Sequence, residues 1–179
     1  MSTTKILIAG FGGQGVLFAG KYLAYQGLLE GRQLSWLPSY GPEMRGGTAN
    51  CSVILSDEPV GSPIVTEPDV LIVMNLPSYD KYESSVVSGG LILLDSSLID
   101  RPTARSDVRT VRVPATAMAR EQGIPTLANM ILLGMAAAHL EILSPEALRQ
   151  AISAVFARKG EAIVAANLKA FDLGLNAAK

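Results

Sequence analysis

Lys5-Ile6-Leu7-Ile8-Ala9-Gly10-Phe11-Gly12-Gly13-Gln14-Gly15 is the stretch that decides the fold. An apolar run leads into glycines spaced as G-x-G-x-x-G, and a second apolar run, Val16–Ala24, follows. This order predicts a strand, a tight turn and a helix over about residues 13–30. Glycine tolerates positive φ and lacks the Cβ that would keep a phosphate away from the backbone. Because the first amides of a helix have no internal partners and carry the positive end of its dipole, the turn suits an anion.

A glycine-rich turn also allows close strand-to-helix packing without any ligand, so the motif alone leaves both interpretations open. A nicotinamide dinucleotide site has, in addition, an acidic residue about 20 residues further on. Here the next apolar run, Gln33–Leu37, ends in Pro38, Ser39 and Tyr40, with no carboxylate. The sequence therefore argues against an ordinary NAD site and favours another phosphate-bearing ligand.

Residues 38–47 form a second glycine-rich segment, with two prolines and three glycines, and we predict a loop there. It follows a strand, as the turn at 10–15 does, so in a parallel sheet both would open at the same edge. Arg45 is then the natural cation for a phosphate or carboxylate. The alternative is that Arg45 pairs with Glu43 or Glu67 and that the loop only caps the sheet.

The remaining chain predicts an α/β fold. Further strands are expected over 49–55, 69–74, 91–95 and 108–113, and helices over 124–140, from Ser144 onward, and after a break at Gly160. The link after residue 55 is too short for a crossover helix, so one neighbour there should be antiparallel. We predict one domain over residues 1–179: a three-layer, mostly parallel but mixed sheet with helices on both faces and a Rossmann-like first βα unit.

Two residues that end strands, Asn75 and Asp95, could cap the next turn or touch a ligand. Arg109 and Arg112 indicate that the strand over 108–113 lies at a sheet edge. The apolar helix over 124–140 contains Gly134, so a neighbour can approach it closely, and it should be buried in the core or at a subunit interface.

Composition limits the classes of function. Hydrophobic residues make up 49% of the 179 residues and charged ones 17%, so partner subunits are expected to cover part of the surface. A net charge of −1 without a basic stripe gives no reason to expect nucleic acid. The longest apolar run, 130–140, is too short to cross a bilayer, and residues 1–5 lack the form of a signal peptide. We expect a cytoplasmic protein with no membrane contact.

The single cysteine, Cys51, excludes an internal disulfide and an iron–sulfur cluster held by this chain alone, since such clusters need about four thiolates. Cys51 lies in an apolar run and should be a small buried residue, and the single histidine, His139, should be structural. No metal site and no catalytic residue are predicted.

Two motifs together, Gly10–Val16 and Ser39–Gly47, resemble those of the gamma subunit of 2-oxoacid:ferredoxin oxidoreductases. The resemblance covers nearly the whole chain and is greatest for the 2-oxoglutarate type, ahead of the pyruvate and ketoisovalerate types. A subunit of indolepyruvate oxidoreductase has a similar form and is the near alternative.

The resemblance implies a complex with alpha and beta subunits, often with a ferredoxin-like delta chain. The complex decarboxylates a 2-oxoacid on thiamine diphosphate with magnesium, passes electrons through iron–sulfur clusters to ferredoxin and forms an acyl-CoA. The chain itself lacks a Gly-Asp-Gly motif for thiamine diphosphate and a cysteine set for a cluster. It should therefore bind no cofactor alone and be catalytically silent. The resemblance implies that the chain supports the assembly and contributes to the CoA side of the site.

The candidate contacts to a phosphate-bearing ligand are Gly10, Gly12, Gly13, Gln14, Gly15, Ser39, Tyr40, Glu43, Arg45, Gly46 and Gly47. The same loops could instead contact the alpha or beta subunit, as in a pure scaffold. A third possibility, from a different class, is a free-standing nucleotide- or flavin-binding protein.

Overall fold

The computed structural model describes residues 2–41 and 47–178. The strands are β1 (Thr3–Phe11), β2 (Gln33–Tyr40), β3 (Thr48–Ser56), β4 (Val70–Val73), β5 (Leu91–Asp95) and β6 (Arg109–Val113). The α-helices are α1 (Val16–Leu29), α2 (Leu76–Tyr82), α3 (Ala115–Glu121), α4 (Ala128–His139), α5 (Pro145–Phe156) and α6 (Glu161–Ala177).

The strands form one mixed sheet in the order β2-β3-β1-β4-β5-β6. β1, β4, β5 and β6 are parallel, whereas β3 is antiparallel to both of its neighbours, β1 and β2. The predicted antiparallel neighbour is thus confirmed. Because two antiparallel steps separate β2 from β1, these strands run in the same direction and end at the same edge of the sheet.

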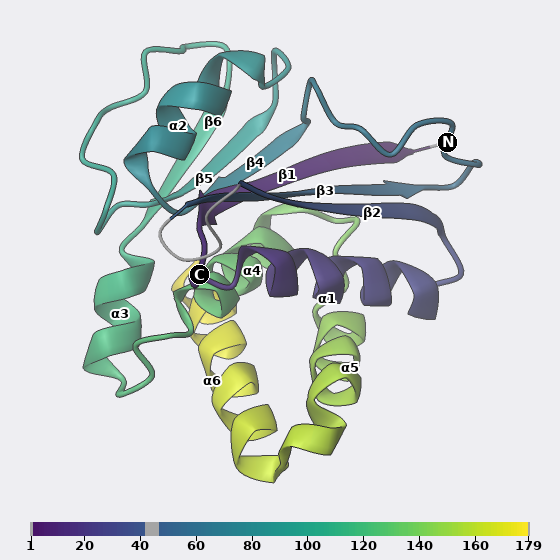
Figure 1. Ribbon diagram of the computed structural model, residues 1–179, viewed down its shortest axis with the longest axis vertical. Helices are drawn as coiled ribbons and strands as arrows, with labels where there is room; N and C mark the ends of the chain where they lie inside the picture. The colour runs from purple at the N-terminus through teal and green to yellow at the C-terminus, as the bar shows by residue number, and fades with distance from the viewer. Residues whose placement is uncertain (1, 42–46, 179) are drawn as a thin grey trace.

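Helices lie on both sides of the sheet, which confirms the three-layer α/β prediction (Figure 1). α1 and α4 pack on one face with the larger part of the core, and α3, α5 and α6 lie on that same side. α2 covers the other face over a smaller apolar cluster, which includes Leu7, Leu71, Tyr79 and Ile92. β4 and β5 are buried along their whole length, which explains their continuous apolar sequences.

Several boundaries differ from the sequence prediction. The strand predicted over 33–37 continues through Tyr40, so the loop prediction was wrong for residues 38–40. β2 is an edge strand, where a proline without an N–H is tolerated, and Pro38 pairs opposite Cys51 there. The first helix begins at Val16 because the four residues before it form the turn. The short helices α2 and α3 were not predicted.

α4 is buried over Ala128–Ala137, as predicted, and α6 is the neighbour that approaches it closely. A Cβ on Gly134 would overlap the Phe171 carbonyl, and one on Gly174 would overlap the Ile131 carbonyl. The two backbones therefore meet at reciprocal glycines, and no side chain fits between them.

The ends of β4 and β5 carry caps. Asn75 Oδ1 accepts the Ser78 N–H at 2.9 Å and begins α2, and Asp95 Oδ1 accepts the Ser97 N–H at 3.0 Å. Asp95 Oδ2 also accepts the Thr116 N–H at 3.1 Å, which joins β5 to α3. The capping alternative for both residues is confirmed, and β6 with Arg109 and Arg112 is the predicted edge strand.

A buried carboxylate, Glu83, holds the loop between β5 and β6 on the α2 side of the sheet. It accepts hydrogen bonds from Tyr79 Oη at 2.8 Å, Thr103 Oγ1 at 2.9 Å and the Ala104 N–H at 3.1 Å, and pairs with Arg101 Nη2 at 2.6 Å. We call these five residues the Glu83 network. Each of the other four residues donates a hydrogen bond to the Glu83 carboxylate, so the network orders the loop over residues 101–104.

Candidate functional site

The two glycine-rich bends lie side by side at the sheet edge where β1 and β2 end. The Gly12 N–H donates to the Gly47 carbonyl at 2.8 Å, and the Gly41 N–H donates to the Thr48 carbonyl at 2.8 Å. Phe11 of β1 pairs with Thr48 of β3 at the same level. The prediction that both bends open at one edge is confirmed for the residues that the structure describes.

The turn between β1 and α1 leaves the start of α1 open. Gly13 and Gly15 have φ angles of 96° and 75°, values that favour glycine over every other residue. Within the described residues, no side chain caps α1 and no acidic residue stands in its first turn. The amides of that turn therefore keep their capacity to donate to an anion.

Gln14 has a different role from its glycine neighbours. Its Oε1 accepts the Phe11 N–H at 2.7 Å, and its Nε2 donates to the Met74 carbonyl at 3.0 Å. The side chain thus ties the end of β1 to the end of β4, and both of its polar atoms have partners.

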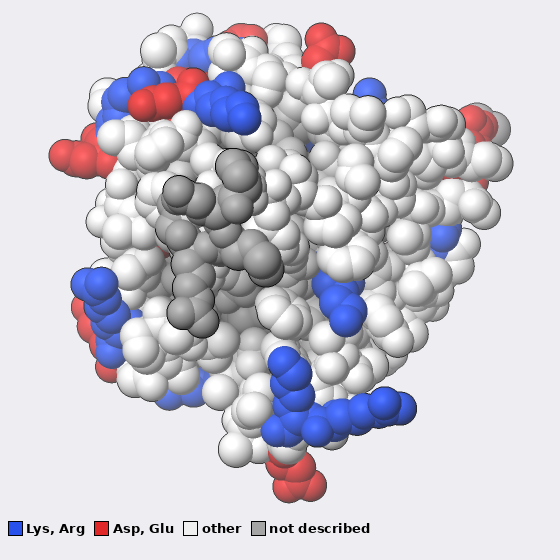
Figure 2. Space-filling model, viewed as in Figure 1, with Lys and Arg blue, Asp and Glu red and all other residues white. Residues whose placement is uncertain are grey.

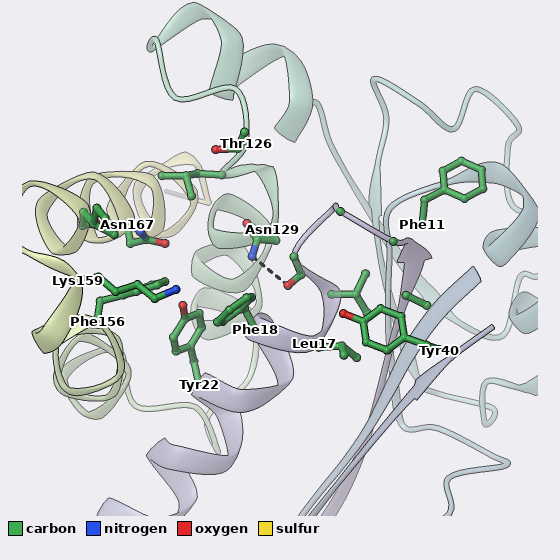
Figure 3. Close-up of a pocket in the computed structure, with 17 residues that line it drawn as sticks. Phe11, Leu17, Phe18, Tyr22, Tyr40, Thr126, Asn129, Phe156, Lys159 and Asn167 are labelled. Atoms are coloured by element: carbon green, nitrogen blue, oxygen red, sulfur yellow. Dashed lines mark hydrogen bonds between the residues drawn. The ribbon is translucent and has the colours of Figure 1, made fainter. Parts of the chain in front are cut away.

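A cavity of about 360 Å³ opens beside the turn (Figure 3). Its walls come from the turn, the first half of α1, the start of α4, the junction of α5 with α6, and the ends of β2 and β3. Four predicted site residues line it: Gly12, Gly13, Gly15 and Tyr40.

Other predicted contacts lie elsewhere. Gly10 is buried in β1, and Gly47 contacts the turn through its carbonyl without lining the cavity. Ser39 projects from the opposite face of β2 to Tyr40, because successive strand residues alternate. Glu43, Arg45 and Gly46 lie outside the described residues, so their roles stay sequence-based predictions.

Aromatic side chains line the end of the cavity away from the turn. Phe18, Tyr22 and Phe156 lie with ring centroids 5.7 to 6.5 Å apart. Lys159 Nζ stands 5.4 Å from the Phe18 centroid and 5.6 Å from the Phe156 centroid, within cation–π range. This end therefore combines flat apolar surfaces with one positive charge.

Two buried polar atoms in the cavity wall have no hydrogen-bond partner among the described residues: Tyr22 Oη and Asn129 Oδ1. Tyr22 is 0% exposed and Asn129 is 6% exposed. Burial raises the pKa of Tyr22, so its hydroxyl stays protonated. Leaving such a group unpaired costs about 1–3 kcal/mol, and a ligand that supplied a partner would remove this cost.

Asn129 also fixes the turn itself. Its Nδ2 donates to the Gly15 carbonyl at 3.1 Å, so α4 supports the residue that begins α1 (Figure 3). The sequence analysis did not find Tyr22, Asn129 or Lys159. Asn129 at the start of an otherwise apolar helix was the available signal, but only the fold brings it to the glycine turn.

Cys51 is the small buried residue that the sequence predicted. Trp36 Nε1 donates to Cys51 Sγ at 2.9 Å, and burial raises the pKa of the Cys51 thiol to about 12, so the thiolate is not formed at neutral pH. His139 ends α4 and contacts Arg109; burial and then the Arg109 charge lower its pKa. Over residues 2–41 and 47–178, no cluster of three or more His, Cys, Asp or Glu residues has the geometry to hold a metal ion.

Fold and site together define an α/β protein with a glycine-rich strand-to-helix turn suited to an anion at the carboxyl edge of its sheet. Residues 5–177 match the pyruvate ferredoxin/flavodoxin oxidoreductase family, and the chain belongs to this family. The family-level resemblance read from the two motifs is therefore confirmed.

Curated relatives carry two kinds of name. The ketoisovalerate oxidoreductase subunit VorA of Methanothermobacter thermautotrophicus is 46% identical over 95% of this chain and 35% of its own length. The 2-oxoglutarate synthase subunit KorC of Methanocaldococcus jannaschii is 35% identical over 98% of this chain and 94% of its own length. The chain thus spans about a third of the VorA relatives that it matches and nearly the whole of this KorC relative.

Two solved structures are similar over almost the whole chain. The gamma subunit of a keto/oxoacid ferredoxin oxidoreductase from Geobacter sulfurreducens PCA has a TM-score of 0.86 and 33% identity, with 99% of this chain and 97% of that chain covered. The 2-oxoglutarate:ferredoxin oxidoreductase from Magnetococcus marinus, with 2-oxoglutarate, coenzyme A and succinyl-CoA bound, has a TM-score of 0.91 and 26% identity. In that case 99% of this chain matches 31% of the other.

Proposed function

We propose that this chain is the gamma-type unit of a 2-oxoacid:ferredoxin oxidoreductase, an enzyme that converts a 2-oxoacid and CoA to an acyl-CoA and reduces ferredoxin. The observation that carries the proposal is its match to nearly the whole of the Geobacter gamma subunit. Residues 1–179 would then form one domain. The sites for thiamine diphosphate, magnesium and iron–sulfur clusters would lie on alpha and beta partners, with a ferredoxin-like delta chain in some assemblies.

The surface supports the presence of partners. Figure 2 shows a face whose broad centre carries few charged side chains. On α1 and β2, large apolar residues face outward, with Leu28 61% exposed and Leu29 49% exposed. Such surfaces are typical of subunit contacts. Among the described residues, no helix is long and apolar enough to span a bilayer. A cytoplasmic location of the complex stays part of this proposal, as expected from the sequence.

The proposed role of this chain is to bind the phosphate-bearing part of CoA at the turn that begins α1. The open amides of the first turn, reached past Gly13 and Gly15, would donate to phosphate oxygens. Arg45 would add a charge-assisted contact. The Magnetococcus relative, whose structure contains CoA, shares the fold over 99% of this chain, which supports a CoA role.

For the substrate, we propose 2-oxoglutarate, because the KorC relatives correspond to this chain over most of their own length. The higher identity to VorA makes a branched-chain 2-oxoacid the alternative, although that match covers only about a third of the relative. Indolepyruvate is a further alternative within the same reaction class.

The test is reconstitution. The purified chain alone should not reduce a viologen dye with any 2-oxoacid and CoA, whereas co-expression with alpha and beta chains should give 2-oxoacid-dependent reduction. A panel of 2-oxoglutarate, 2-oxoisovalerate, pyruvate and indolepyruvate then assigns the substrate. Turnover by the isolated chain would contradict the proposal.

Arg45→Ala separates a CoA role from a scaffold role in the assembled enzyme. Loss of a charge-assisted hydrogen bond should raise the KM for CoA by about 10- to 100-fold with kcat nearly unchanged. Arg120→Ala, an exposed position on α3 outside the cavity, is the matched control. An unchanged KM in both variants would leave subunit packing as the function of the loop.

A free-standing nucleotide- or flavin-binding protein is the second candidate, and the unpaired groups in the cavity wall favour it. A thermal-shift comparison of the isolated chain with CoA, NAD(P), FAD and ATP tests it directly. A tight dinucleotide hit without partner chains would support this candidate over the gamma-type unit.

A further inference from the structure

The sheet has two edge strands, β2 and β6, and only one of them contains a proline. That strand is β2, with Pro38, whereas β6 has the sequence Arg-Thr-Val-Arg-Val. The inner side of β6 pairs with β5 in a parallel ladder. Its outer side is the second border of the sheet, on the far side from β2.

The hydrogen bonds of β6 show which of its backbone groups face outward. The Arg109 N–H donates to the Gly90 carbonyl at 2.9 Å, so the backbone groups of Arg109 point at β5. Because these groups alternate along a strand, those of Thr110 and Arg112 point away from the sheet. In the part of the chain that the structure describes, no backbone group pairs with them. A further strand at this border would complete the missing bonds.

We propose that the outer edge of β6 binds an extended segment of a partner protein as an added strand, with carboxylates on the side of the sheet that α2 covers. This inference goes beyond the proposed function, because it assigns an interaction surface away from the glycine turn. It requires neither CoA nor a 2-oxoacid.

The side chains of β6 give the two faces of such a strand different chemistry. Val111 packs against the larger core on the α4 side, whereas Thr110 and Arg112 point to the α2 side, because successive strand residues alternate. On the α2 side a cavity of about 310 Å³ is lined by Asp100, Pro102, Thr103, Thr110 and Arg112. Alternate residues of an added strand have the same spacing as Thr110 and Arg112. One of its side chains would therefore enter the cavity, and the next would lie beside the arginine.

Thr110 requires a hydrogen-bond partner. Its Oγ1 is buried in the cavity wall and has none among the described residues. A hydroxyl can donate to a carboxylate oxygen, so an acidic side chain in the cavity would satisfy it. This is the way in which added strands gain specificity, since the backbone ladder binds any sequence and the pockets beside it select side chains.

Two arginines favour an acidic segment. Arg112 Nη1 donates to the Arg101 carbonyl at 3.1 Å, and its Nη2 donates to the Ile99 carbonyl at 2.7 Å, so the loop holds the guanidinium at the edge. Arg109, at the start of the same strand, contacts His139. No carboxylate of the described residues lies within 4.0 Å of either guanidinium. Carboxylates across the new ladder would thus be favourable cross-strand neighbours.

Two other charges bear on the choice of occupant. Asp100 contributes a carboxylate to the cavity lining, but it is exposed, and water and salt screen its repulsion of an incoming carboxylate. A second copy of this chain fits poorly, because pairing two β6 strands would bring the arginines of both copies to one border.

Titration calorimetry of the full chain with two end-blocked, seven-residue peptides tests the proposal. In one peptide glutamate alternates with valine, and in the other lysine replaces glutamate. The glutamate peptide should bind at least about tenfold more tightly than the lysine peptide. Equal affinities, or no binding of the glutamate peptide at about 1 mM, would overturn the proposal.

Amide hydrogen exchange followed by NMR reports the ladder itself. With the glutamate peptide bound, the Thr110 and Arg112 amides should exchange about tenfold more slowly or less, because each gains a backbone partner. The Trp36 amide, which faces outward on the other edge strand, is the control and should not change. Binding of the peptide without slower exchange at Thr110 and Arg112 would overturn the added strand.

Matched variants localise the binding. Thr110→Pro removes an N–H that the fold does not use, and edge strands tolerate proline, so the chain should stay folded and lose the peptide. Arg112→Gln should weaken the glutamate peptide by about fivefold or more, whereas Arg120→Gln, an exposed position of α3 outside the cavity, should not. Unchanged affinity in both Thr110→Pro and Arg112→Gln would overturn the assignment.

Gel filtration of the chain over a range of concentrations tests the other occupant. A dimer that Thr110→Pro abolishes would overturn the proposal and assign the edge to a second copy. None of these outcomes bears on reconstitution or on the KM for CoA, because Thr110 and Arg112 do not line the cavity beside α1. A failure of the edge proposal is therefore distinguishable from a failure of the proposed function.

Discussion

Two regions on opposite faces of the sheet bury polar side chains, and they treat them in opposite ways. In the Glu83 network both carboxylate oxygens accept hydrogen bonds, and these bonds order the loop over residues 101–104. In the cavity beside α1, Tyr22 Oη and Asn129 Oδ1 are equally buried but have none among the described residues. The comparison teaches that completed pairing orders a loop in the first region, whereas in the second region two unpaired polar atoms share the wall of one cavity, which is why a ligand is expected there.

The largest effect should come from breaking the paired region. Glu83→Gln removes the charge that faces Arg101 and turns one acceptor oxygen into a donor, so the free energy of unfolding at pH 7 should fall by about 2–3 kcal/mol. Urea unfolding followed by circular dichroism measures this. Glu146→Gln, at an exposed position of α5, is the control and should change stability by less than about 0.5 kcal/mol.

The same network predicts a pH dependence. Burial alone would raise the pKa of Glu83, but the hydrogen bonds from Tyr79, Thr103 and the Ala104 N–H, with Arg101, outweigh it and lower the pKa below its ordinary value of 4.5. Because the folded-state pKa is the lower one, ionised Glu83 stabilises the fold above about pH 4.5, and this contribution is lost as the pH falls through the folded-state pKa. Melting curves from pH 7 to pH 3 should therefore show a smaller acid-induced loss in Glu83→Gln than in the unmodified chain. Parallel curves would contradict this assignment.

The next prediction concerns the glycine turn beside the cavity with the unpaired groups. Gly15→Ala places a Cβ against the Asn129 side chain at a φ of 75°, and should cost about 1–2 kcal/mol of stability and raise the KM for CoA of the assembled enzyme by about tenfold or more. Gly31→Ala has a similar φ of 68° but open space around it, so it reports the backbone cost alone. If the two variants give the same KM for CoA, the turn is not part of the ligand site.

The smallest effect tests the comparison most directly, because it uses two fully buried tyrosines. Tyr22→Phe removes a hydroxyl without a partner among the described residues and should raise the free energy of unfolding by up to about 1 kcal/mol. Tyr79→Phe removes a hydroxyl that donates to Glu83 and should lower it by about 1–2 kcal/mol. The same sign in both variants would remove the distinction between the two regions.

Local sequence patterns were sufficient for much of the fold. β1, the turn and α1 follow from apolar periodicity and glycine spacing, and the antiparallel step at β3 follows from a link too short for a crossover. The shared edge of the two bends followed from strand direction. Pro38 misled the prediction because its tolerance depends on β2 lying at an edge, which is a property of the whole sheet.

The site was predicted only in part, for a similar reason. The glycine spacing is a local pattern, so Gly12, Gly13 and Gly15 were found, and the last two take positive φ. Tyr22, Asn129 and Lys159 come from three elements far apart in the chain and look like ordinary helix residues in the sequence. Their juxtaposition arises from α4 and the α5–α6 junction packing beside α1, which no local pattern encodes.

Pro38 has one more consequence, which concerns edge-to-edge pairing between the sheets of two molecules. The Gly41 N–H donates inward to β3, so the alternation along β2 directs position 38 outward. The outer row of backbone donors is therefore interrupted there, and a foreign strand adding to this border would find its ladder broken within two residues of the glycine-rich end. The proline thus acts as a built-in stop against uncontrolled lateral growth.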